Sequence, residues 1–153
     1  MPAPRLRKRE PWAMTEFALI YPMFAMVLLT FVVLIALFRT RTQSVRTRKV
    51  SAQYFQTYHG EIEPDSSIKL SRHFANIFEA PTLFYIACVS ALAVGQNAIA
   101  FHLLAWAYVA LRAAHACIHI GSNKLRQRVK AYFASWGVLL LMWMYLAVGL
   151  AFS

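Results

Sequence analysis

The chain has 153 residues, of which 59% are hydrophobic and only 14% are charged, whereas about a quarter of the residues in a soluble domain are charged. This composition excludes a disordered chain and a disulfide-stapled secreted domain, and it disfavours a water-soluble globule. The net charge of +10 would indicate a nucleic-acid-binding surface in a soluble protein, but in a membrane protein it reports topology, so we expect no nucleic-acid partner.

Uncharged stretches predict four membrane-spanning helices, because about 20 apolar residues cross a bilayer. The first stretch, near the N-terminus, is too long for the apolar part of a signal peptide. The second stretch, 80–111, holds Gly95-Gln96-Asn97 near its middle, which predicts a turn between two helices. The helices are expected at about 17–38, 70–94, 98–120 and 131–152. We therefore predict one all-α domain over residues 1–153, an integral membrane four-helix bundle.

The loops at the two ends of this bundle differ in charge. Loops 39–69 and 121–130 lie at one end and together carry 10 Lys and Arg residues, whereas the segment before the first helix carries 4. Cytoplasmic loops of membrane proteins are enriched in Lys and Arg. We therefore expect loops 39–69 and 121–130 in the cytoplasm and both termini on the other side.

Two of the predicted helices carry polar residues at depths where a charge is costly. Spacings of three and four residues place each set on one helix face. The sets are Arg72, Asn76 and Glu79 in the second helix, and Arg112, His115 and His119 in the third. At ~1.5 Å per residue, Glu79 and Arg112 lie ~13 and ~12 Å from the same membrane face. We expect these two charges to pair inside the bundle, in a polar pocket that opens to the cytoplasm.

Simpler roles for these residues remain open. A buried ion pair can fix the register of two helices without binding a ligand. His115 and His119 resemble the two histidines of a helical zinc site, but no acidic or Cys third ligand accompanies them, so we expect no metal. His102, Cys88 and Cys117 are expected to be packing residues. The sequence has no G-x-S-x-G, no phosphate-binding glycine loop and no C-x-x-C.

The polar motifs are more specific than their polarity. The segment Arg72-His-Phe-Ala-Asn76-Ile-Phe-Glu79-Ala-Pro81 resembles the MAPEG family, the membrane-associated proteins in eicosanoid and glutathione metabolism. A second match is Tyr108-Val-Ala-Leu-Arg112-Ala-Ala-His115, followed by Gly121-Ser-Asn123-Lys and Arg128. The resemblance, which is greatest to bacterial members, covers about residues 72–136. It implies a homotrimer and a bacterial inner-membrane protein, in which the charge asymmetry of the loops predicts that both termini are periplasmic.

The resemblance also implies a ligand and a site. Glutathione, as a co-substrate, would bind between adjacent subunits near the cytoplasmic face. Its binding residues would be Arg72, Asn76, Glu79, Arg112, His115 and His119. One arginine at the start of the fourth helix would stabilise the thiolate, because a thiol with a pKa near 8.5 needs a nearby cation to ionise at neutral pH. Spacing from His119 favours Arg126 for this role, and spacing from Asn123 favours Arg128.

Three functions fit these observations. The first is a membrane glutathione transferase or peroxidase acting on small lipophilic electrophiles that enter from the lipid bilayer. The second is a non-catalytic trimeric membrane protein that binds a small anion or lipid in the same pocket. It gains weight because glutathione-using members commonly have tyrosine where His119 stands. The third is a small transporter with Glu79 and the histidines as a proton relay, which the lack of a Gly/Pro-broken helix pair disfavours.

The orientation is testable with reporter fusions. A reporter joined after Ser153 is expected to behave as periplasmic, because the more basic loops lie at the opposite end of the bundle. An alkaline phosphatase fusion should be active there, and a fusion to a fluorescent protein that matures only in the cytoplasm should be dark. The opposite pair of signals would overturn the topology and place the polar pocket on the periplasmic side.

Overall fold

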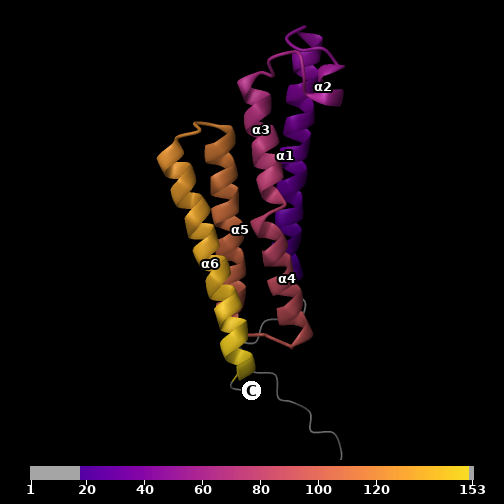
Figure 1. Cartoon of the computed structure of the whole chain (residues 1–153). Coiled ribbons are helices and arrows are strands. Elements are labelled where there is room, and N and C mark those ends of the chain that lie inside the picture. Colours follow the sequence, from indigo (N-terminus) through magenta and orange to yellow (C-terminus); the bar gives the residue numbers. More distant parts are fainter. Residues whose placement is uncertain (1–17, 152–153) are drawn as a thin grey trace, which may run out of the picture.

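The computed structural model describes residues 18–151, and over this range the chain is helical and contains no strand (Figure 1). Four spans are long and apolar enough to cross a membrane, which confirms the prediction of an all-α protein with four such helices. The helices are α1 (Ile20–Arg46), α2 (Tyr54–Thr57), α3 (Asp65–Ile77), α4 (Ala80–Ala93), α5 (Ile99–Ile120) and α6 (Leu125–Ala151). Helices α3 and α4 together form the second span.

Three spans continue further toward the charged loops than hydropathy indicated. Helix α1 ends at Arg46, α3 begins at Asp65 and α6 begins at Leu125, where we expected these ends at residues 38, 70 and 131. Hydropathy detects only the part of a helix that matches the hydrocarbon layer, whereas Arg, Lys and Gln are good helix formers beyond it. The expected loop 39–69 is therefore shortened to 47–64. Phe17 and residue 152, which the prediction included, lie outside the described residues.

The second span is broken where α3 meets α4. The amides of Phe78 and Glu79 bond to the carbonyls three residues before them, at 3.0 and 3.3 Å, and Glu79 has a ψ of −94°. Pro81 accounts for the break, because proline has no amide hydrogen and its ring clashes with the carbonyl four residues earlier. Residues before and after the break therefore do not follow one continuous helical face.

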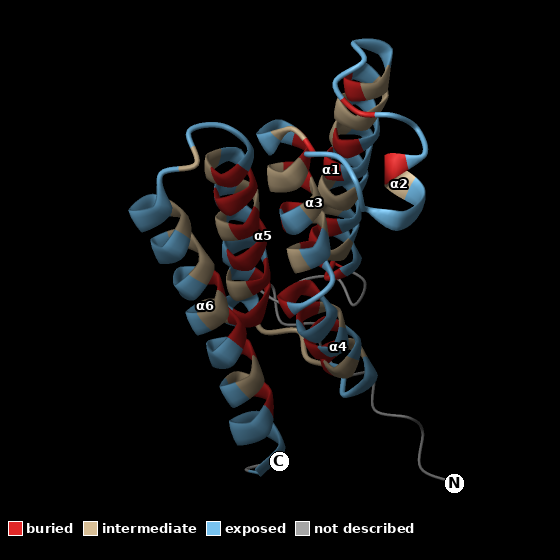
Figure 2. Ribbon diagram, turned by 45° about the horizontal axis from the view of Figure 1, so that its top comes forward, coloured by how far each residue is buried: buried red, intermediate tan, exposed pale blue. Residues whose placement is uncertain are grey.

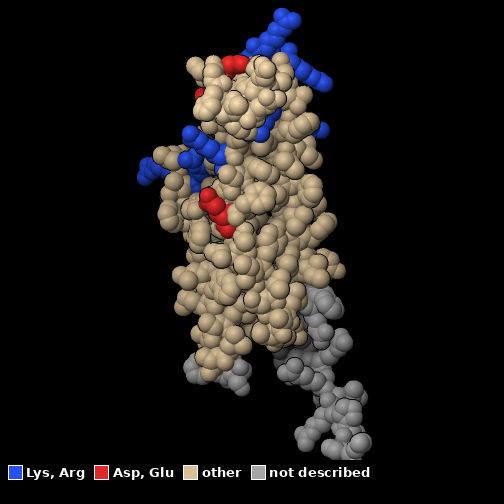
Figure 3. Space-filling model, turned by 45° about the vertical axis from the view of Figure 1, so that its right-hand side comes forward, with Lys and Arg blue, Asp and Glu red and all other residues tan. Residues whose placement is uncertain are grey.

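The helices pack with their buried residues facing inward (Figure 2). Helix α5 packs along α6, and α1 packs mainly along α3. The main apolar core includes Met26, Phe84, Tyr108, Leu139 and Met142, and the rings of Phe84 and Tyr108 stack at 4.6 Å. The α1–α3 and α5–α6 connections lie at one end of the bundle, which we call the basic end (Figures 1 and 3).

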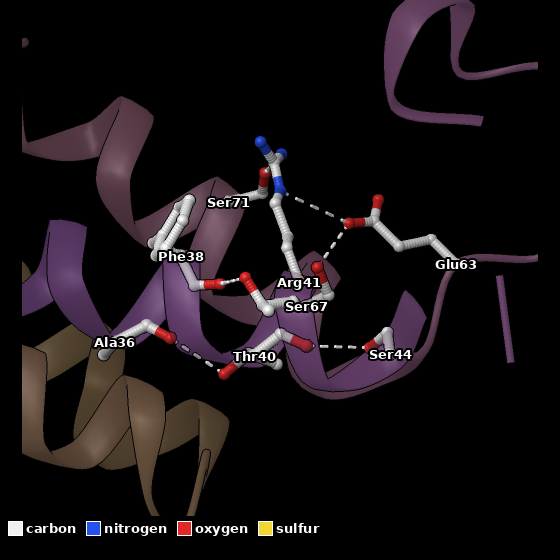
Figure 4. Close-up of polar contacts among 9 residues, drawn as sticks. Ala36, Phe38, Thr40, Arg41, Ser44, Glu63, Ser67 and Ser71 are labelled. Carbon is white, nitrogen blue, oxygen red and sulfur yellow. Dashed lines mark hydrogen bonds and ion pairs between the residues drawn. The ribbon is translucent and has the colours of Figure 1, made fainter. Parts of the chain in front are cut away.

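Arg41 of α1 holds segment 47–64 against the basic end (Figure 4). Its guanidinium donates to the Ser71 hydroxyl of α3 at 2.6 Å and lies 3.9 Å from the Glu63 carboxylate. The same guanidinium lies over the rings of Phe55 and Tyr58, with its carbon 5.1 and 5.6 Å from their centroids. One side chain of a membrane helix therefore contacts the next membrane helix and the segment between them.

Replacing Arg41 should loosen this segment without unfolding the bundle. Arg41→Met keeps an aliphatic stem but removes the hydrogen bond, the ion pair and the cation–π contacts. A partly exposed ion pair contributes ~0.2–1 kcal/mol and an exposed cation–π contact ~0.5–1 kcal/mol, so amides in 47–64 should exchange with deuterium several-fold faster while α5 and α6 keep their protection. Arg39→Met, at an exposed position of the same helix, is the matched control. Equal exchange in both variants would contradict the role of Arg41.

Candidate functional site

A polar cavity of about 240 Å³ lies between α3, α5 and α6. Its lining residues are Arg72, Asn76, His115, His119, Arg128, Val129 and Tyr132. Five of the eight residues that the sequence indicated are among them. Arg112 lies buried next to Asn76, whereas Glu79 and Arg126 do not line the cavity and are exposed on the subunit.

Each of the three helices presents a pair of cavity residues one turn apart. Helix α3 contributes Arg72 and Asn76, α5 contributes His115 and His119, and α6 contributes Arg128 and Tyr132. Side chains at i and i+4 point to the same side of a helix. Three such pairs enclose one space only because α5 and α6 pack closely against each other and α3 packs against α5.

The turn between α5 and α6 aims Arg128 at the cavity. Asn123 has a left-handed backbone with φ 48°, which asparagine tolerates better than most residues. Its side-chain oxygen accepts a hydrogen bond from Nη1 of Arg128 at 2.8 Å. At Gly121, an added Cβ would lie 2.8 Å from the Cys117 carbonyl oxygen, so the turn has no room for a side chain there. The structure therefore brings Arg128, and not Arg126, to the cavity.

The predicted ion pair between Glu79 and Arg112 is replaced by a bridge through Asn76. Arg112 is only 1% exposed, and its Nη2 donates to the Asn76 side-chain oxygen at 2.8 Å and to the Asn76 carbonyl at 3.2 Å. The Asn76 amide donates in turn to Glu79 at 2.9 Å. Depth arithmetic placed the two charges at the same level, but it assumed an unbroken helix. The break before α4 places the Glu79 carboxylate on the outside of the subunit.

Three histidine rings gather at the floor of the cavity, one of which the sequence analysis missed. His73 of α3 is buried, and its ring centroid lies 5.4 Å from that of His115 and 5.0 Å from that of His119. It was missed because it stands one residue outside the stripe through Arg72 and Asn76. Its spacing of three residues from Asn76 could have placed it on the flank facing α5. Within residues 18–151, no group of three His, Cys, Asp or Glu residues has metal-site geometry.

Comparison with protein families identifies the chain. The model of the MAPEG family matches residues 19–148, which include most of every membrane helix. The protein belongs to the MAPEG family. No match was found among curated proteins or among solved structures. The family match extends the resemblance seen at residues 72–136 to α1, while the bacterial subtype stays a prediction.

Buried hydrogen-bond donors without protein partners lie behind the cavity lining of this MAPEG protein, on residues that contact Asn76, Tyr132 and His115. In the described part of the chain they include Nε and Nη1 of Arg112 and Nε1 of Trp136, and both ring nitrogens of His73 are also unpaired. Buried polar groups are almost always satisfied. No carboxylate lines the cavity, whereas two guanidinium groups do and a third lies behind Asn76. The lining arginines therefore suit the cavity to a ligand that brings negative charge.

The Asn76 bridge predicts which pairs of mutations are coupled. Asn76→Ala removes the side-chain oxygen that accepts from Arg112 at 2.8 Å and leaves only the backbone carbonyl at 3.2 Å, and hydrogen bonds to charged groups contribute ~1.5–3 kcal/mol. Thermal or denaturant unfolding in detergent should show a loss of that size. The Asn76/Arg112 double-mutant cycle should give a coupling above ~0.5 kcal/mol. Glu79→Gln combined with Arg112→Met should couple more weakly than the first pair, because Glu79 and Arg112 meet only through Asn76. A coupling in this second cycle as strong as in the first would restore the direct ion pair.

Proposed function

We propose that this MAPEG protein is a membrane glutathione transferase or peroxidase that acts on small lipophilic electrophiles. The observation that carries the proposal is the placement of Arg128, which Asn123 holds at the wall of a cationic cavity without carboxylates. A guanidinium is always charged at physiological pH, and it pairs well with both carboxylate and thiolate. The site is therefore suited to an anionic thiol.

The donor set around the cavity fits glutathione. The peptide carries two carboxylates and one thiol, and the cavity offers the guanidinium groups of Arg72 and Arg128 together with the amide of Asn76. Bidentate contacts between arginine and carboxylate are among the stronger hydrogen bonds in proteins. Arg72 and Asn76 on α3 would hold the peptide, and Arg128 on α6 would face the sulfur. Glutathione would supply the nucleophilic sulfur, which attacks the electrophile once it is ionised.

The outer surface of the subunit supports assembly and access from the bilayer. Large apolar side chains such as Phe24, Phe31 and Leu140 are exposed, as on a surface that meets lipid or another subunit. Glu79 is exposed as well, although it lies within the second membrane span. A carboxylate facing lipid is costly, so we propose that a neighbouring copy in a homotrimer covers Glu79. The apolar co-substrate would then enter from the bilayer of the bacterial inner membrane.

A second candidate function uses the same cavity without chemistry. A non-catalytic trimer would bind a small anion or a lipid headgroup through the same guanidinium groups. The observation that favours it is His119, which lines the cavity at the position where glutathione-using members commonly have tyrosine. The two candidates differ in whether the cavity ionises a thiol, and this difference can be measured directly.

Thiolate formation separates the enzyme from the binder. Glutathione bound to the purified protein should absorb near 240 nm at neutral pH, because each unit by which the thiol pKa falls requires ~1.4 kcal/mol of anion stabilisation, which a desolvated guanidinium supplies. Arg128→Ala should remove this absorbance and leave much of the binding. Arg126→Ala, an exposed arginine on the same helix turn, is the control and should change neither.

Each other outcome has a definite consequence. Binding without thiolate between pH 6.5 and 8 would favour the non-catalytic binder. A signal lost in Arg126→Ala but kept in Arg128→Ala would reverse the assignment of the two arginines. No binding of glutathione at millimolar concentration would remove glutathione from both candidates.

A further inference from the structure

The hydrogen bond of His115 fixes which of its ring nitrogens carries the proton. Nδ1 lies 3.2 Å from the backbone carbonyl oxygen of Arg128. A carbonyl oxygen can only accept, so Nδ1 must donate and therefore holds the ring hydrogen. A neutral imidazole has only one such hydrogen. Nε2 of His115 is consequently the nitrogen with the free lone pair.

The ring that carries this free lone pair is part of the cavity wall. His115 is one of the lining residues. Within the described part of the chain, its Nε2 forms no hydrogen bond, and it is not one of the buried polar atoms that lack a partner. By contrast, both nitrogens of His73 are sealed from solvent, and so is Nδ1 of His119. Among the three clustered histidines, His115 is the one whose tautomer a backbone carbonyl determines.

The charges around His115 keep its ring neutral when the cavity is empty. Arg72 and His73 face it from α3, Arg112 and His119 from α5, and Arg128 and Tyr132 from α6. Three of these groups are cations and none of the described residues lining the cavity is a carboxylate, so a positive charge on the ring is disfavoured until an anionic ligand offsets them. While the ring is neutral, Nε2 keeps its lone pair and can accept a proton from a ligand. A proton held there can later be transferred to a reaction product.

We propose that Nε2 of His115 is the general base that removes the thiol proton in this cavity, an inference that rests on the proposed function. The S–H bond breaks, its electron pair stays on sulfur, and the proton moves to Nε2, while Nδ1–H keeps its bond to the Arg128 carbonyl. Arg128 then serves both products: its guanidinium faces the thiolate, and its carbonyl accepts from the imidazolium. The catalytic pair is thus one imidazole and one residue of α6.

The same step indicates a class of electrophile. When the thiolate attacks an epoxide or an activated double bond, a new S–C bond forms and the C–O bond of the epoxide or the π bond of the alkene breaks. The electron pair released at oxygen or carbon then needs a proton. The imidazolium Nε2–H supplies it and returns His115 to its neutral form. Protons and electrons balance within the cavity. Additions of this kind therefore suit the site better than halide displacements, which would leave the proton on His115.

The test uses His115→Asn in the full-length protein in detergent. The amide nitrogen of asparagine takes the place of Nδ1 and can still donate to the Arg128 carbonyl, but the side chain has no basic nitrogen. His102→Asn is the matched control, because His102 is buried in the same helix and its Nδ1 lies 3.0 Å from the Ala98 carbonyl. Stopped-flow absorbance at 240 nm follows thiolate formation, and calorimetry follows binding of S-methylglutathione, which has no thiol proton.

General-base catalysis contributes ~10²–10⁴-fold to a rate, so His115→Asn should form the thiolate at least ~100-fold more slowly than the unmutated protein and His102→Asn. The rate is compared at saturating glutathione, where it does not depend on affinity, and His102→Asn should bind S-methylglutathione as the unmutated protein does. Thiolate formation in His115→Asn at the unmutated rate would overturn the role of His115 and leave the proposed function standing. Failure of the unmutated protein to bind S-methylglutathione or to form a thiolate would instead overturn the proposed function.

A second measurement decides the matter if His115→Asn does not fold. Nitrogen-15 spectra of histidine-labelled unmutated protein distinguish a bare from a protonated ring nitrogen. At neutral pH, His115 should show a protonated Nδ1 and a bare Nε2 before ligand is added. A protonated Nε2 in the ligand-free protein would exclude it as the base.

Discussion

The buried guanidinium of Arg112 is the group on which the arrangement of the site depends. A positive charge within a membrane helix is costly unless other protein groups satisfy it. Arg112 meets part of this requirement, at Nη2, with two acceptors on a single residue of α3, the carbonyl and the side-chain oxygen of Asn76. Those acceptors fix how α3 and α5 are aligned along their lengths. The cavity residues one turn nearer the basic end, Arg72 on α3 and His119 on α5, are aligned by the same contact.

This dependence gives the motif around Asn76 a structural role as well as a functional one. Pro81 breaks the second span, and the break leaves the last turn of α3 with carbonyls that are not all used within the helix. Asn76 sits in that last turn and shares its carbonyl between the Glu79 amide and Arg112. The spacing of Asn76, Glu79 and Pro81 therefore lets α3 end with a free acceptor next to the buried Arg112. The cavity begins at Asn76 and extends toward Arg72, in the direction of the basic end.

The sequence predicted well which segments are helices, but it predicted poorly the direction in which side chains point around each helix. Both results have physical reasons. Uncharged runs are required in order to cross hydrocarbon, so four spans could be found from hydropathy alone. Helix ends that project beyond the hydrocarbon are charged and look like loops, which is why α1 and α6 are longer than predicted. Arg126 and Arg128 could not be separated because the choice depends on the left-handed turn at Asn123. The trimer, glutathione and the orientation stay predictions.

The polar residues illustrate the same limit. Depth follows from the rise per residue, and it set Glu79 level with Arg112, whereas in the structure Arg112 bonds to Asn76. The direction of a side chain around the helix follows from periodicity only while the helix is continuous, and the break before Glu79 removed that condition. His73 was missed for the opposite reason: the helix is continuous there, but the chosen stripe was too narrow to include its flank.

Asn76 also joins the cavity to the outer surface of the subunit. Its side chain accepts from Arg112 through oxygen and donates to Glu79 through nitrogen, so the amide can make both bonds in only one orientation. The Glu79 carboxylate is exposed and accepts a hydrogen bond from Asn76, so a group that covers this carboxylate also affects Asn76. Asn76 in turn binds the guanidinium of Arg112 behind the cavity. The contact surface and the ligand site are thus two ends of one hydrogen-bonded chain. A trimer contact at Glu79, if it forms as proposed, would therefore act on the residue that holds Arg112 behind the cavity.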